Sequence, residues 1–364
     1  MVDSDKKGSF LGDGVIFVIS QPRSGSTLLQ RVLAGSPEVQ TSAETWLMLH
    51  PVYWNKGTWN SRKKQIETEY NAWWARAAVE EFLDNYTDGR QIYDEAIRAW
   101  AKVIYANALN QNGKAYFLDK TPRYFFIIKD LYRLFPQAKF VFLLRNPMAV
   151  LASELNTYVK GDWPVLGRFR PDLLDAPGWI LEGIDMLGDQ AITVRYEDFV
   201  SDPEKQIACL CRFLGIRFHE EMLVYSKTPQ PIGRFNDPSG VARHSSTTTA
   251  SVDKWQQLVH DDQSLYFARC YLEALGKDTI SRFGYDYAEI TSILHTRELL
   301  LRGLYPWTTA MRPRSEWAWG ERFASDLYFS RRDHGNVKGV LMTASKYFRR
   351  IHKLPAALSP RGNR

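Results

Sequence analysis

Hydrophobic and polar residues follow one another along this chain in blocks that predict buried strands, each leading into a helix. The first block, residues 15–19, is entirely apolar and rich in β-branched side chains, as expected of a strand covered on both faces. A small polar loop, residues 21–27, interrupts the apolar run. The run resumes over residues 28–34 as a helical segment that stops at Gly35.

The same order of strand and helix recurs further along the chain. Residues 139–144 form a second apolar run and precede a predicted helix over residues 148–158. Residues 191–195 predict another strand, followed by a helix that starts after Asp202-Pro203 and ends at Gly215. Strands that alternate with helices in this way are typical of α/β proteins, in which crossover helices connect the strands of a parallel sheet.

The loop after the first strand has the composition of an anion-binding site. A helix N-terminus offers N–H groups without intrahelical partners and the positive end of the helix dipole. Ser24, Ser26 and Thr27 add hydroxyl donors, Gly25 allows a tight curl, and Arg23 brings a permanent positive charge. We therefore predict that phosphate or sulfate binds here.

This loop differs from the nucleotide triphosphatase pattern G-x-x-x-x-G-K-[ST]. Ser20 stands where the first glycine would be, and Ser26 follows Gly25 in place of the lysine. The side chain that reaches the β- and γ-phosphates of a nucleoside triphosphate is therefore missing from its position. A phosphotransferase with an aberrant loop stays an alternative, which dependence on ATP and magnesium would reveal.

A second set of polar residues follows the strand at residues 139–144. Arg145 stands at the carboxyl end of this strand, where open α/β sheets bind ligands. Ser153 lies eight residues further on, within the predicted helix. Taken alone, Arg145 could be a solvated charge and Ser153 an ordinary helical serine. Their spacing, together with the loop, resembles the 3′-phosphate site of sulfotransferases.

The order of four motifs extends this resemblance to the sulfotransferase family. The loop P-R-S-G-S-T, the Arg145–Ser153 pair, the run from Tyr196 to Gly215 and the late segment at residues 251–255 follow the family order over about residues 15–287. The pattern is similar to the tyrosylprotein and the bacterial carbohydrate or small-molecule branches. It implies an α/β fold, a P-loop-like three-layer sandwich with a central parallel sheet flanked by helices.

The resemblance also implies a donor and a set of residues that hold it. The donor would be 3′-phosphoadenosine-5′-phosphosulfate (PAPS), the product 3′-phosphoadenosine-5′-phosphate (PAP), and no metal would be needed. The implied donor-binding residues come from all four motifs: Arg23, Ser24, Gly25, Ser26, Thr27, Arg145, Ser153, Tyr196 and Lys254.

Sulfuryl transfer needs alignment, stabilisation of negative charge and removal of one proton. Arg23 is one candidate catalytic cation. Lys120 is the second, because it follows the short apolar run at residues 115–118 in a segment similar to the family's D/N-K-x-P. The alternative for Lys120 is a surface lysine before a proline turn.

The family offers two kinds of catalytic base. Soluble phenol sulfotransferases carry a histidine two residues after the lysine, but here that position is Pro122. The protein-tyrosine branch uses a glutamate about twenty residues after the loop, and Glu44 matches it. We therefore predict Glu44 as the base, with His50 as a fallback and a simple helix-opening role for Glu44 as the alternative.

Two positions depart from the protein-tyrosine branch. Thr157 stands where that branch has an arginine, and Asp253 where it has a serine before Lys-Trp. They weaken the assignment of donor contacts beyond Arg145 and Ser153, and they argue against simply naming this a tyrosylprotein enzyme. The main hypothesis is an acceptor hydroxyl of a glycan, glycolipid or secondary metabolite. Tryptophans such as Trp46, between the loop and Lys120, could stack on a sugar ring or belong to the core.

Composition limits the remaining possibilities. The chain has 364 residues, which suffices for a large domain, placed at residues 1–290, and a C-terminal extension at 291–364. A net charge of +6 suits an anionic donor without requiring nucleic acid, and we predict no nucleic-acid partner. Three cysteines without metal-binding spacing, and no run resembling a signal peptide or membrane span, favour a cytoplasmic enzyme.

The C-terminal extension carries a separate pattern. Apolar residues recur at helical spacing between Val337 and Leu354, and basic residues fill many of the positions from Lys338 to Lys353. Such a basic amphipathic helix can contact a membrane peripherally, dock a partner or pack on its own domain. A non-catalytic nucleotide-binding or membrane-docking module is therefore a further alternative, and the pattern leaves the oligomeric state open.

Overall fold

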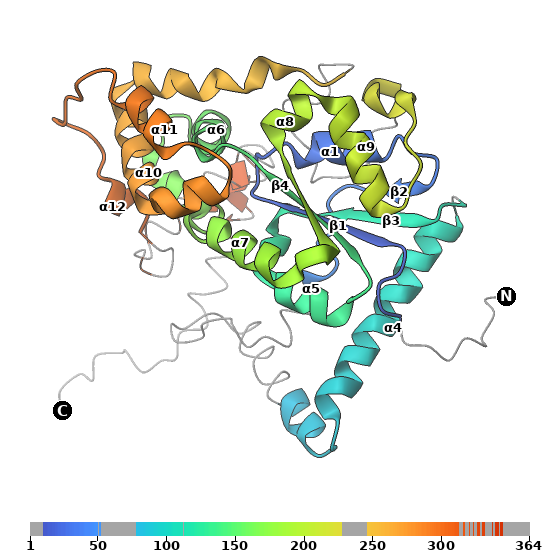
Figure 1. Cartoon of the computed structure of the whole chain (residues 1–364). Coiled ribbons are helices and arrows are strands. Elements are labelled where there is room, and N and C mark those ends of the chain that lie inside the picture. The colour runs from blue at the N-terminus through green and yellow to red at the C-terminus, as the bar shows by residue number, and fades with distance from the viewer. Residues whose placement is uncertain are drawn as a thin grey trace, which may run out of the picture.

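A central parallel sheet organises the molecule. The computed structural model describes residues 10–49, 51, 78–111, 113–227 and 246–312, and isolated positions between 316 and 344. In this part of the chain five strands form one sheet in the order β2-β3-β1-β4-β5 (Figure 1). The strands are β1 (Val15–Ser20), β2 (Val39–Thr41), β3 (Tyr116–Lys120), β4 (Lys139–Leu144) and β5 (Ala191–Arg195).

Every strand pair in this sheet is parallel, as the alternation of strands and helices predicted. β1 lies in the middle, where Phe17 pairs with Asp119 of β3 on one side and with Phe140 of β4 on the other. The predicted strand at residues 115–118 is displaced, because β3 continues through Asp119 and Lys120. Both of these side chains are buried. Their burial depends on polar partners, so the hydrophobic pattern of the sequence did not predict that the strand includes them.

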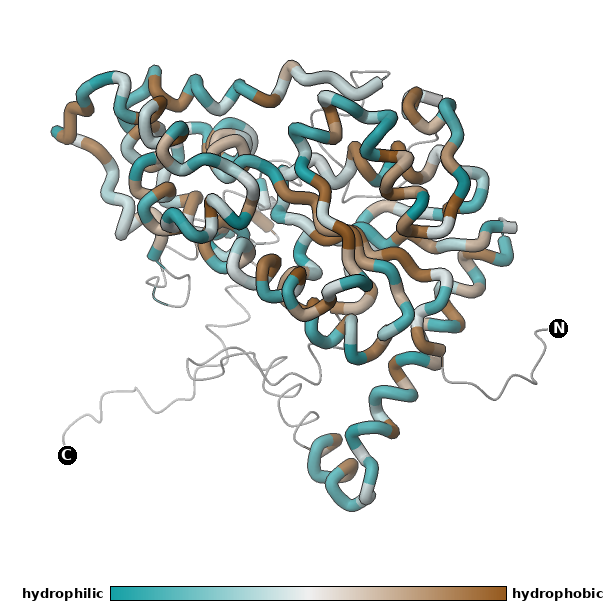
Figure 2. Tube along the Cα trace, in the orientation of Figure 1, coloured by the Kyte–Doolittle hydropathy of each residue, from teal (hydrophilic) through white to brown (hydrophobic). Residues whose placement is uncertain are grey.

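Helices cover both faces of the sheet. On one face Phe17 and Ile19 pack in a core with residues of α4 (Gly89–Asn110), α5 (Ile128–Leu134) and α7 (Ala176–Leu187). On the other face Ile16 and Val18 pack with α1 (Ser26–Leu33) and α9 (Pro203–Leu214). Figure 2 shows the apolar strands between these helical layers. The predicted three-layer α/β fold is confirmed.

A second core lies beside the sheet. The helices that form it are α6 (Pro147–Glu154), α10 (Asp262–Arg282), α11 (Tyr287–Leu294) and α12 (Trp307–Ala310), which gather together in Figure 1. Leu294 and Met311 are buried in this core, so the described chain continues to pack beyond the boundary proposed at residue 290. That boundary stays a prediction.

Shorter elements join these parts. α8 (Tyr196–Ser201) follows β5 directly. The 3₁₀ turns are η1 (Pro122–Ile127), η3 (Trp163–Phe169), η5 (Gly188–Gln190), η6 (Glu220–Leu223), η7 (Tyr225–Lys227), η9 (Thr249–Ser251) and η10 (Asp253–His260). Two single π-helical segments are η2 (Leu155–Val159) and η4 (Pro171–Asp175). The helix predicted over 148–158 is therefore α6 followed by a π turn.

The structure bears on two further predictions, the absence of a membrane span and the amphipathic helix in the C-terminal extension. Among the described residues there is no helix with the length and apolar character that a bilayer span requires. The amphipathic helix predicted in the C-terminal extension falls largely outside the described residues. At its described positions, Val337 and Leu341 are 75% and 63% exposed.

Candidate active site

The loop between β1 and α1 curls tightly at the carboxyl edge of the sheet. Arg23 and Gly25 both have left-handed backbone conformations, with φ of 68° and 88°. A Cβ on Gly25 would lie 2.6 Å from ring carbons of Tyr196, so this position needs glycine for space as well as for backbone conformation. α1 begins at Ser26, two residues before the predicted helical run, which places Ser26 and Thr27 in the first turn.

Buried polar atoms around this loop lack protein partners. The Ser24 hydroxyl and the Nε of Arg145 are both buried, and neither makes a hydrogen bond within the described part of the chain. Unsatisfied buried polar groups are rare in folded proteins and call for a ligand, ion or water. The donors available here are hydroxyl, guanidinium and helix N-terminal N–H groups, which fit an anionic phosphate ester.

Arg145 directly follows β4, at the carboxyl edge of the sheet. Its Nη1 donates to the Arg23 carbonyl at 2.9 Å and its Nη2 to the Ser251 carbonyl at 3.1 Å. The guanidinium carbon stands 4.3 Å from the centre of the Tyr196 ring, a cation–π arrangement. Burial lowers the pKa of Arg145, while the neighbouring Tyr196 raises it; an arginine nonetheless stays charged in proteins.

The two predicted phosphate subsites are in direct contact. Arg23 donates through Nε to the Ser153 hydroxyl at 3.1 Å, and Arg145 binds the Arg23 carbonyl. The structure thus brings together Arg23 and Ser24 of the loop, Arg145 and Ser153 of the second motif, and Tyr196 of the third.

Lys254 is the remaining predicted donor-binding residue, and the donor contacts of all these residues stay predictions. It lies on η10, three residues beyond Ser251, with an exposed side chain. Its donor contact stays a prediction.

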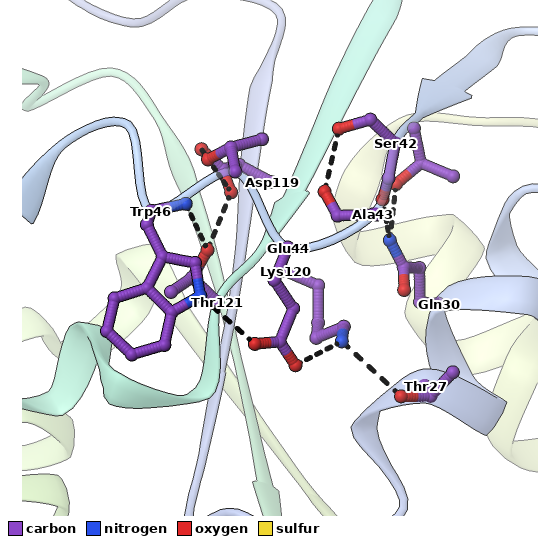
Figure 3. A network of polar contacts seen from close by, with 11 residues as sticks. Thr27, Gln30, Ser42, Ala43, Glu44, Trp46, Asp119, Lys120 and Thr121 are labelled. Carbon is purple, nitrogen blue, oxygen red and sulfur yellow. Dashed lines mark hydrogen bonds and ion pairs between the residues drawn. The ribbon is translucent and has the colours of Figure 1, made fainter. Parts of the chain in front are cut away.

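Lys120 connects the loop to the predicted base. Its side chain is only 1% exposed, and its Nζ lies 2.8 Å from Glu44 Oε1 and 3.3 Å from the Thr27 hydroxyl. Figure 3 shows these groups in a row, with Thr27 and Glu44 on either side of the ammonium. The alternative of an exposed lysine before a proline turn is excluded by this burial.

Glu44 lies between β2 and the start of the next turn. Residues 44–46 adopt no helical structure, so the alternative that Glu44 merely opens a helix is wrong. Its side chain is 19% exposed, which leaves room for a partner. Its second oxygen accepts a hydrogen bond from the Trp46 indole at 3.3 Å. His50, the fallback base, lies outside the described residues.

Asp119 is a buried residue of the site that the sequence did not reveal. Its carboxylate accepts hydrogen bonds from the hydroxyls of Thr45, Tyr105 and Tyr124 at 2.9 Å, and from Thr121 at 3.3 Å. Burial raises the pKa of Asp119, and these hydroxyls act in the opposite direction. Thr45 and Tyr105 come from distant segments, so no local sequence pattern indicated this cluster.

Glu154 is a second group that the sequence did not reveal. It follows Ser153, is 1% exposed, and neither carboxylate oxygen makes a hydrogen bond in the described chain. Burial, and then the nearby Asp172, raise the pKa of Glu154 to about 8, while Arg23 and Arg123 act against this shift. Asp172 itself pairs with Arg123 at 2.7 Å.

The fold is a P-loop-like α/β sandwich, and its candidate anion-binding residues lie at the carboxyl edge of the sheet. Residues 15–220 match the model of the sulfotransferase family. The chain belongs to the sulfotransferase family, whose standard sulfuryl donor is PAPS. The resemblance inferred from the motifs is confirmed.

Two curated relatives align with most of the chain. Nodulation protein NoeE of Sinorhizobium fredii is 26% identical over 311 residues, which are 78% of this chain and 68% of NoeE. A putative protein-tyrosine sulfotransferase of Caenorhabditis briggsae is 25% identical over 278 residues, covering 73% of this chain and 90% of the relative. Among solved structures, the sulfotransferase domain from the curacin biosynthetic pathway matches with a TM-score of 0.46 and 22% identity, over 68% of this chain and 92% of that one.

Proposed function

We propose that this enzyme transfers a sulfuryl group from PAPS to an acceptor hydroxyl, with Glu44 as the base and Lys120 and Arg23 as the catalytic cations. The observation that carries the proposal is the position of Lys120. Its ammonium contacts both Thr27 of the anion loop and the carboxylate of Glu44. One buried cation thereby joins the donor side of the site to the only carboxylate that contacts Lys120 within the described chain.

The donor would be held at both of its phosphate ends. Arg145 and Ser153 would bind the 3′-phosphate, and the loop from Arg23 to Thr27 the 5′-phosphosulfate. The unsatisfied Ser24 hydroxyl and Arg145 Nε support this, because each is a buried donor in need of an anionic acceptor. Tyr196 would stay in place as the surface that supports Arg145.

PAPS supplies the sulfuryl group when it is bound, and PAP is the leaving group. Glu44 takes the proton of the acceptor hydroxyl while the acceptor oxygen bonds to sulfur and the bond from sulfur to the 5′-phosphate oxygen breaks. Lys120 and Arg23 stabilise the negative charge that develops on the transferred group and the leaving phosphate. A buried ammonium suits this role, because its charge is little screened by water.

The acceptor would be a hydroxyl of a glycan, a glycolipid or a secondary metabolite. Thr157 and Asp253 depart from the protein-tyrosine pattern, which argues against simply naming this a tyrosylprotein enzyme. The three cysteines are free in the structure, which supports a reducing compartment such as the cytoplasm.

Calorimetric titration of the purified protein tests the donor. We expect binding of PAP and no binding of ATP with magnesium. Binding of ATP in preference to PAP would favour the phosphotransferase alternative. Binding of neither nucleotide would contradict the assignment of both phosphate subsites.

A further inference from the structure

The segment that carries Glu44 is fastened to the segment that carries Lys120. Thr45 donates its hydroxyl to Asp119, and the backbone N–H of Trp46 donates to the Thr121 hydroxyl at 3.2 Å. Two residues after Trp46, the backbone N–H of Met48 donates to the Tyr124 hydroxyl at 3.1 Å. Side chains on either side of Lys120 thus hold the chain segment that follows Glu44.

Held by these contacts, Trp46 has an unusual backbone conformation. Its φ is 53°, in the left-handed region that a bulky side chain rarely occupies. Such backbone strain persists only where surrounding contacts impose it, and it gathers at functional sites. Figure 3 shows the Trp46 side chain in this conformation, with the indole N–H facing Glu44.

The Trp46 indole and the Lys120 ammonium each contact a different oxygen of the Glu44 carboxylate. The indole Nε1 donates to Oε2 of Glu44 at 3.3 Å, and the ammonium of Lys120 lies 2.8 Å from Oε1. A glutamate carboxylate otherwise rotates over a broad range about its last torsion. One donor on each oxygen fixes the plane of the group, and the indole, which is a donor only, offers no competing acceptor for a proton.

We propose that Trp46 is a positioning residue, which holds Glu44 in the orientation that takes the proton of the acceptor. This proposal rests on the proposed function, because Trp46 acts through Glu44, which is the base of that function. Trp46 also packs against the core on one face of the sheet, as one of its two expected roles required, and the hydrogen bond to Glu44 adds a polar role to it.

Nuclear magnetic resonance of the indole N–H groups tests the contact without any acceptor. Trp46→Phe keeps an aromatic ring, loses the donor and identifies the Trp46 resonance by its disappearance. In Glu44→Gln that resonance should shift, because an amide replaces a charged acceptor. A resonance that stays in place in Glu44→Gln would overturn the proposal.

Turnover of PAPS with water as the acceptor tests the consequence. Trp46→Phe should lower kcat about 10-fold or more, as expected when a hydrogen bond to a charged group is lost, with PAP affinity unchanged. Trp307→Phe, the same exchange in the second core, should leave kcat unchanged. Equal kcat in Trp46→Phe and wild type would contradict the positioning role. Absence of PAP binding to the wild-type protein would contradict the proposed function instead.

Discussion

At the scale of single residues, the site is built on buried charges that find their partners in distant parts of the chain. Arg145 is held by two backbone carbonyls and the Tyr196 ring, and Lys120 by Glu44 and Thr27. Because these partners fix the two cations before any ligand arrives, little ordering is needed when an anion binds.

Replacement of Arg145 tests the 3′-phosphate subsite. Arg145→Ala should weaken PAP binding by about 2–5 kcal/mol, since one partner of a desolvated charge pair is lost. Arg282→Ala is the matched control, because Arg282 pairs with the exposed Asp185 on the surface. Calorimetry that gives the same dissociation constant for Arg145→Ala and wild type would remove Arg145 from the site.

The pKa of Glu154 predicts a pH dependence of stability. The folded protein holds the proton up to about pH 8, whereas the ordinary pKa of this carboxyl is 4.5. Between these values the unfolded chain has released a proton that the folded chain keeps. Raising the pH therefore lowers the free energy of unfolding, by about 1.4 kcal/mol per pH unit at most. The stabilisation is complete below the lower value and is lost as the pH passes the higher one.

Glu154→Gln should remove this part of the slope. Urea unfolding between about pH 5 and pH 8 measures it for the variant and for wild type. Glu182→Gln, at an exposed ion pair with Lys129, should keep the wild-type slope. Identical slopes for Glu154→Gln and wild type would show that this carboxyl does not carry the dependence.

At the scale of elements, the carboxyl ends of the strands determine where the chemistry lies. β1 leads into the anion loop, β3 ends on Lys120 and β4 is followed by Arg145, so residues from three motifs meet at one edge of a parallel sheet. The loop after β1 leaves no room for a side chain at Gly25, because a Cβ there would meet the ring of Tyr196.

Comparing Gly25, in the loop, with Gly215, outside it, distinguishes an effect on stability from an effect on donor binding. Gly25 and Gly215 both have left-handed backbones, with φ of 88° and 77°. The left-handed backbone alone makes alanine at either position cost about 1–2 kcal/mol of stability, and the Tyr196 ring adds a steric cost at Gly25. At Gly215 the nearest atom to a new Cβ is the Tyr116 hydroxyl at 3.6 Å, whereas at Gly25 it is the Tyr196 ring at 2.6 Å.

Gly25→Ala should therefore lose PAP affinity, while Gly215→Ala should keep it. Thermal unfolding and calorimetric titration of both variants measure the two effects. Wild-type PAP affinity in Gly25→Ala would mean that the curl of the loop is not part of the donor site.

The sequence predicted these elements unevenly, for physical reasons. The strand at residues 15–20 and the helix ending at Gly215 were predictable because continuous apolar burial and a glycine C-cap are local signals. β2 (Val39–Thr41) was not, since three residues form no pattern. The end of β3 was also missed, because Asp119 is buried by hydroxyls from Thr45 and Tyr105 that only the tertiary structure brings close.

At the scale of the whole molecule, the sheet and its helical layers hold together residues that are far apart in the sequence. Motif order alone suggested that Glu44 and Lys120 share a site. The structure adds their 2.8 Å contact, the Trp46 indole on the other carboxylate oxygen and the buried Glu154. None of these three has a local sequence signal, because each depends on the packing of separate elements.

Metal independence stays a prediction that an activity measurement can test. The cationic groups Arg23, Lys120 and Arg145 would supply the charge stabilisation that a divalent ion gives in many phosphoryl transfers. We expect sulfuryl transfer to continue at an unchanged rate after dialysis against EDTA. A loss of rate that magnesium restores would contradict this expectation.

The most direct test of the account is transfer of the labelled sulfuryl group from PAPS to a mixture of glycans, glycolipids and small-molecule alcohols. We predict that wild-type protein labels an acceptor, and that Glu44→Gln binds PAP normally but transfers about 10²–10⁴ times more slowly. Glu182→Gln should match wild type. Transfer by Glu44→Gln at the wild-type rate would contradict the assignment of Glu44 as the base on which this account depends.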